Sequence, residues 1–141
     1  MIRKGSAVWQ GGLKDGKGTV STESGVLSNI QYSFGSRFES GVGTNPEELI
    51  GAAHAGCFSM ALSGELGKLN MTAQSISTTA SVKLEVGTSG ASVTEIHLDT
   101  TAKIPGADKV AFDKAANNAK AGCPISKLLN AKITMDAKLE S

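Results

Sequence analysis

The segment 49–64 contains no charged residue and directly follows a strong helix-start signal. Asn45 suits the N-cap position, Pro46 suits the first helical position, and Glu47 and Glu48 place acidic side chains in the first turn. The uncharged segment is rich in Gly and Ala, which let another backbone approach closely. These features predict a central helix that is buried on nearly all sides.

Short alternating segments on both sides of this helix predict strands. Before the helix, glycine-rich turns separate expected strands at 6–10, 19–22 and 32–39. After it we expect a hairpin of strands 76–86 and 96–104, helices at 108–120 and 124–129, and a strand at 133–139. This order predicts an α+β fold in which antiparallel sheets surround the buried central helix.

Composition excludes several classes of protein. A length of 141 residues fits one compact domain, residues 1–141. The net charge of +1 gives no electrostatic reason to bind nucleic acid or an anionic membrane. The uncharged segment is shorter than the ~20 residues of a membrane span, and the first residues lack the apolar stretch of a secretory signal. We therefore expect a cytoplasmic protein with reduced thiols.

The two cysteines, Cys57 and Cys123, are too few for a disulfide framework. Cys57 lies inside the apolar helix, where it is either a small packing residue or a reactive thiol. An apolar environment raises a thiol pKa, and the helix start is about 16 Å away. A reactive Cys57 therefore requires a nearby cation.

Arg37 is the obvious cation, because 12 of the 14 basic residues are lysines and Arg37 lies between Phe34 and Phe38. It is either a solvated strand residue or a thiolate partner. Cys123 stands between Gly122 and Pro124, beside an expected helix start that favours a thiolate, although it is equally a simple N-cap. Two thiols in such different settings suggest an attacking and a resolving cysteine.

The sequence gives little support for metal binding or nucleotide binding. His54 and Cys57 could share a helical face as metal ligands, but His97 and Cys123 have no fixed spacing to them. No nucleotide-binding or hydrolase motif is present. We expect neither a metal nor a cofactor.

Three segments resemble the OsmC/Ohr family of osmotically inducible and organic-hydroperoxide-resistance proteins. Residues 43–62 resemble its central helix motif, 119–126 its second cysteine motif, and 18–27 its osmotically inducible branch. The resemblance implies an intertwined homodimer and a thiol-dependent peroxidase that acts on organic hydroperoxides and more weakly on hydrogen peroxide. It also implies recycling by an external dithiol, of lipoyl type.

By position, the resemblance makes Cys57 the peroxidatic cysteine, Cys123 the resolving cysteine, Arg37 the thiolate-stabilising arginine and Glu47 the acid that holds it. The resistance branch carries its arginine in an early glycine-rich turn, which here is 12–17 and has none. Arg37 therefore favours the osmotically inducible branch. Glu47 and Cys57 are ten helical residues, about 15 Å, apart, so both can serve one site only if Arg37 spans the gap or Glu47 comes from a second chain. We expect the second arrangement.

Four apolar residues are the predicted substrate-binding set and would favour alkyl hydroperoxides: Phe34, Phe38, Phe58 and Met60. Two other functions stay open. A redox sensor or small-molecule-binding protein would oxidise once without turnover, and a purely structural dimer would have inert thiols.

Overall fold

The computed structural model describes residues 1–141, which form two compact units, Met1–Leu49 and Ile50–Ser141. Helix α2 (Pro46–Gly67) begins in the first unit and continues through the second. The predicted helix start is confirmed: Asn45 Oδ1 accepts a hydrogen bond of 2.8 Å from the backbone N–H of Glu48. None of the four helices has the length and apolar character needed to cross a membrane.

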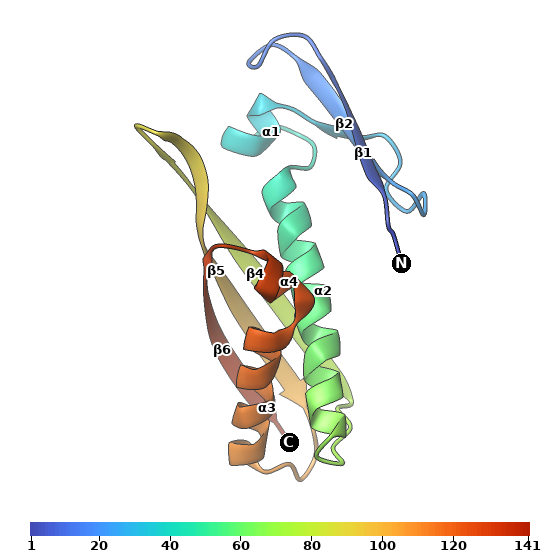
Figure 1. Ribbon diagram of the computed structural model, residues 1–141, viewed down its shortest axis with the longest axis vertical. Helices are drawn as coiled ribbons and strands as arrows, with labels where there is room; N and C mark the ends of the chain where they lie inside the picture. The colour runs from blue at the N-terminus through green and yellow to red at the C-terminus, as the bar shows by residue number, and fades with distance from the viewer. The chain divides into compact units, whose positions relative to one another are not determined.

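The first unit contains a three-stranded antiparallel sheet of β1 (Gly5–Gln10), β2 (Lys17–Thr22) and β3 (Ile30–Tyr32) (Figure 1). Trp9 and Tyr32 both pair with Gly18 of the middle strand. Their ring centroids are 5.4 Å apart, and a Cβ atom at Gly18 would lie 2.5 Å from the Tyr32 ring. The absence of a side chain at Gly18 therefore allows the two rings to meet.

The strand expected at 32–39 is wrong beyond Tyr32, because the chain turns into the short helix α1 (Phe34–Phe38). Ser33 caps this helix: its side chain accepts from the backbone N–H of Ser36, and the Ser36 side chain accepts from the backbone N–H of Ser33. This capping box outweighs the alternating pattern. It also brings Arg37 into a helical turn rather than onto a strand.

The second unit combines most of α2 with β4 (Ser75–Gly87), β5 (Gly90–Lys103), α3 (Lys109–Gly122), α4 (Pro124–Leu128) and β6 (Lys132–Glu140). The predicted α+β order and the long hairpin of β4 and β5 are confirmed. The sheet is not wholly antiparallel, because β6 pairs parallel to β5. Helices α3 and α4 form the crossover that a parallel pair requires.

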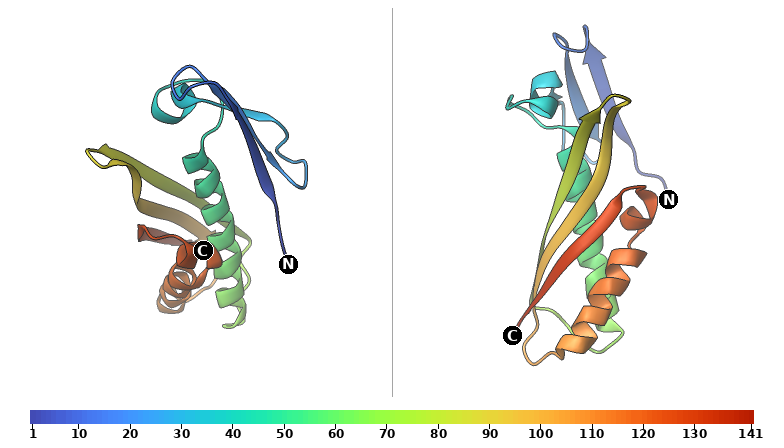
Figure 2. Two further views of the ribbon diagram at one scale, coloured as in Figure 1. Left: turned by 45° about the horizontal axis from the view of Figure 1, so that its top comes forward. Right: turned by 90° about the vertical axis from the view of Figure 1, so that its left-hand side faces the viewer.

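One core fills the space between this sheet and helices α2 and α3, which cover the same face of it (Figures 1 and 2). Its fully buried members include Phe58, Leu62 and Leu66 of α2, Leu98 and Ala102 of β5, and Phe112 and Ala116 of α3. Gly51 lets α2 approach β4, since a Cβ there would lie 3.1 Å from the Ala80 carbonyl oxygen.

The expected burial of α2 on nearly all sides is wrong for the single chain. His54, Phe58, Leu62 and Leu66 recur at helical spacing and form its buried face. The opposite face is exposed and consists of small or apolar residues: Ala52, Ala53, Gly56, Met60, Ser63 and Gly64. The absence of charged residues in segment 49–64 therefore reflects two apolar faces of α2, of which only one is buried within the single chain.

Candidate active site

The two cysteines lie close together in the second unit, both as free thiols. Cys57 is half-buried on α2 and packs against the core cluster that contains the buried Cys123. Cys123 is both the C-cap of α3 and the N-cap of α4, so it is fixed by two helices at once. The structure thus brings together the two residues that the sequence singled out as attacking and resolving thiols.

Local interactions act on the ionisation of Cys57 in opposite directions. Burial is the largest influence and raises the pKa of the Cys57 thiol. A hydrogen bond from the Ile125 backbone lowers this pKa, whereas the neighbouring Cys123 thiol raises it again. The net effect is a raised pKa, and no basic side chain of the second unit opposes it. A cation beside Cys57 would oppose this shift and favour the thiolate.

Cys123 is held by a buried hydrogen-bonded row that the sequence reasoning missed. Its thiol donates to Ser126 Oγ at 3.1 Å and accepts from the Ser126 backbone N–H at 3.3 Å. Ser126 Oγ in turn lies 2.7 Å from His54 Nε2. The available signal was spacing: Ser126 is three residues after an N-cap cysteine, and His54 is one helical turn before Cys57.

Arg37 and Glu47 form an ion pair within the first unit. Arg37 Nε donates to both Glu47 carboxylate oxygens, at 3.0 and 3.3 Å, and Nη2 donates to Oε1 at 2.7 Å. Glu47 is buried, while the Arg37 side chain remains 38% exposed. The carboxylate therefore fixes the guanidinium group and leaves part of it free for another anion.

An apolar hollow of about 260 Å³ lies beside Arg37 in the first unit. Phe34 and Phe38, two of the four residues predicted to bind substrate, line it, and the Arg37 guanidinium lies 5.2 Å from the centre of the Phe38 ring. Trp9, Leu13 and Tyr32 also line the hollow. Sequence reasoning missed these three, although four of the six aromatic residues precede residue 39.

The other two predicted substrate-binding residues lie outside this hollow. Phe58 is fully buried in the core of the second unit, and Met60 is 80% exposed on the uncovered face of α2. Phe58 and Met60 are two residues apart on α2, and helical geometry turns their side chains to different faces of the helix.

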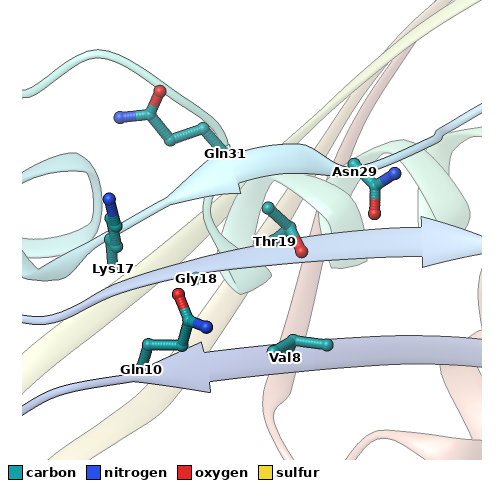
Figure 3. A pocket seen from close by; sticks show the side chains of 7 residues that line it. All are labelled: Val8, Gln10, Lys17, Gly18, Thr19, Asn29 and Gln31. Atoms are coloured by element: carbon teal, nitrogen blue, oxygen red, sulfur yellow. The ribbon is translucent and has the colours of Figure 1, made fainter.

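A second hollow, of about 470 Å³, lies on one face of the first sheet, and none of the predicted site residues lines it (Figure 3). Figure 3 shows polar side chains of Gln10, Lys17, Thr19, Asn29 and Gln31 around it. The structure brings together no group of three or more His, Cys, Asp or Glu side chains that could hold a metal ion.

Comparison with known proteins adds to this geometry. Residues 38–138 match the family model described as OsmC-like protein. Proteins named Peroxiredoxin OsmC from Escherichia coli strain K12 and Shigella flexneri are each 55% identical to this chain over 139 residues. Each match covers 99% of this chain and 97% of the relative.

Solved structures share the fold at lower identity. The organic hydroperoxide resistance protein OhrB of Bacillus subtilis matches with a TM-score of 0.67 and 22% identity, covering 97% of this chain and 98% of its own. An OsmC-like protein from Mycoplasma pneumoniae matches with a TM-score of 0.78 and 15% identity, covering 100% of this chain and 99% of its own.

Proposed function

This chain belongs to the OsmC-like protein family, and from that premise we propose that it is a thiol-dependent peroxidase that reduces organic hydroperoxides to alcohols. The observation that carries the proposal is the pair of neighbouring free thiols, Cys57 and Cys123. The name of the relatives at 55% identity supports the same activity.

In the proposed cycle, the Cys57 thiolate attacks one oxygen of the hydroperoxide and the O–O bond breaks. The departing alkoxide takes a proton and leaves as an alcohol, while Cys57 becomes a sulfenic acid. Cys123 then attacks the Cys57 sulfur, a Cys57–Cys123 disulfide forms and water leaves. An external dithiol, of lipoyl type, reduces the disulfide by thiol exchange and restores both thiols.

Arg37 is proposed to stabilise the Cys57 thiolate, with Glu47 holding its guanidinium group. Glu47 and Cys57 are ten residues apart on α2, a rise of about 15 Å, and Arg37 is paired with Glu47 of its own chain. We therefore propose that the pair serves Cys57 of a second copy. The raised pKa of Cys57 in the single chain supports a cation supplied from outside.

A homodimer follows from the same proposal. The uncovered face of α2, with Ala53, Gly56 and Met60, is apolar and built of small residues, as close packing of two helices requires. The hollow lined by Trp9, Phe34 and Phe38 would take the alkyl group of the hydroperoxide. Two free thiols fit a cytoplasmic, reducing compartment.

Steady-state turnover tests the activity. With cumene hydroperoxide and excess dihydrolipoamide, we expect each chain to consume many equivalents of hydroperoxide, and the Cys57→Ser variant to consume none above background. A redox sensor would consume one equivalent per chain and stop. Full activity in Cys57→Ser would contradict the proposal.

A further inference from the structure

The resolving cysteine is connected to a buried imidazole that the cycle above does not use. His54 is fully buried, yet its ring makes a single hydrogen bond, between Nε2 and Ser126 Oγ, and Nδ1 has no partner. Buried polar atoms without partners are rare because they lose their bonds to water. The unpaired Nδ1 of His54 therefore has a free-energy cost that distinguishes this residue from its apolar neighbours on α2.

The hydrogen bonds run in one direction. Cys123 donates its thiol proton to Ser126 Oγ, so the single hydroxyl proton of Ser126 is free to be donated to His54 Nε2. His54 then carries its own proton on Nδ1. The row therefore leads from a thiol that must lose a proton to a neutral base that can accept one.

The surroundings of His54 keep it neutral. Burial lowers the pKa of His54, and no charged side chain contributes. The titratable group connected to it is the Cys123 thiol, which lies behind Ser126 on the α4 side. Lys127 of α4 is exposed, and the buried residues of β5 carry no charge.

We propose that Ser126 and His54 form a proton relay for the resolving step, with Ser126 as a catalytic residue on the Cys123 sulfur and His54 as the positioning residue behind it. This inference rests on the proposed peroxidase cycle. As Cys123 attacks, its S–S bond to Cys57 forms and the Cys57 S–O bond breaks.

Atoms and electrons balance within this step. The Cys123 proton moves to Ser126 Oγ while the Ser126 hydroxyl proton moves to His54 Nε2, and the departing hydroxide takes a proton from solvent to become water. His54 later returns its proton to solvent. Cys57 sulfur is reduced by one electron and Cys123 sulfur is oxidised by one, so no further reactant is needed.

The relay predicts a distinctive pH dependence. Above the lowered pKa of His54 the base is already available, so the wild-type resolving rate should change little with pH around neutrality. Without the base, the proton of the attacking thiol must be taken by hydroxide from solvent. The resolving rate of the variant should then rise with pH more steeply than that of the wild type.

The test is quenched-flow alkylation after one equivalent of cumene hydroperoxide, with mass spectrometry following the two thiols separately. Loss of free Cys57 reports the peroxide step and loss of free Cys123 the resolving step. His54→Gln retains a polar group near the Nε2 position but cannot take the proton. At pH 7 we expect unchanged loss of Cys57 and at least about tenfold slower loss of Cys123.

Ser59→Ala is the matched control, because Ser59 is a partly buried α2 residue bonded to Thr78 Oγ1 at 2.8 Å, apart from the relay. Both of its steps should keep wild-type rates. A His54→Gln resolving step with the wild-type rate and pH profile would overturn the relay. Absence of Cys57 oxidation in every protein would instead overturn the peroxidase proposal.

Wild-type protein provides a readout that does not depend on how the variant folds. Proton transfer through Ser126 predicts that the resolving step is slowed about twofold or more in deuterated water. An unchanged rate in deuterated water would overturn the relay.

Discussion

Arg37 and Glu47 are joined by three hydrogen bonds, of which the shortest runs 2.7 Å from Nη2 to Oε1. This planar, charge-assisted pairing orients the guanidinium group and leaves part of it exposed. The Cys57 thiol has a raised pKa that no cation of the second unit counteracts. Together these findings support the proposal that each copy holds a cation for another copy rather than for itself.

Mixing two inactive variants tests this exchange between chains. Arg37→Ala lacks the cation and Cys57→Ser lacks the nucleophile, so each should lose nearly all turnover. Mixed dimers would contain one complete site, built from Cys57 of one chain and Arg37 of the other. After subunit exchange we expect recovery of about a quarter of wild-type kcat/KM for cumene hydroperoxide. No recovery, with mixed dimers shown by native mass spectrometry, would contradict an exchanged site.

Cys123→Ser should separate oxidation from resolution. The variant keeps the Cys57 nucleophile, so it should reduce one hydroperoxide per chain and then stop with a sulfenic acid that no thiol can resolve. Labelling with dimedone, followed by mass spectrometry, measures that product at Cys57. Continued turnover at the wild-type rate would show that Cys123 is not the resolving thiol.

The aromatic hollow should set the preference for organic hydroperoxides. Phe38→Ala removes a ring that lines it, and burying a ring of this size against an apolar ligand contributes about 1.5–3 kcal/mol. We expect KM for cumene hydroperoxide to rise about tenfold or more, with little change for hydrogen peroxide. Val26→Ala, at an exposed position outside the hollow, is the control. An equal effect on both peroxides would argue against this assignment.

Burial of neutral His54 should make the fold sensitive to acid. Its pKa is lowered in the folded state, so below about pH 6.5 the unfolded chain binds a proton that the folded chain does not. The free energy of unfolding should therefore fall with decreasing pH, by up to about 1.4 kcal/mol per pH unit from this group, until the folded pKa is reached. Denaturant titrations at several pH values should show this slope in wild type and a smaller one in His54→Gln.

Strong local signals let the sequence predict most elements. Asn45 and Pro46 marked the start of α2, Gly122 and Pro124 marked the junction of α3 and α4, and the alternation in β4 and β5 marked their hairpin. The strand prediction failed at Ser33 and Ser36, because the hydrogen bonds of their capping box form a helical turn in a segment with alternating side chains. The uncovered face of α2 was missed because periodicity does not tell whether a partner lies within the same chain.

The candidate site also contains residues that could be predicted from the sequence and residues that could not. The two cysteines and the Arg37–Glu47 pair stood out through residue type and through resemblance to a family. The row from His54 to Ser126 depends on a contact between residues 72 positions apart, which no local pattern reveals. The position of the Trp9 and Tyr32 side chains in the hollow beside Arg37 likewise depends on the register of the first sheet.

Peptide mass spectrometry after one equivalent of cumene hydroperoxide tests the central claim most directly. The account predicts that non-reduced digests contain the Cys57 and Cys123 peptides joined by a disulfide, that dithiol treatment separates them, and that Cys57→Ser gives no such product. Recovery of both cysteines as free thiols, while the hydroperoxide is consumed, would contradict the account.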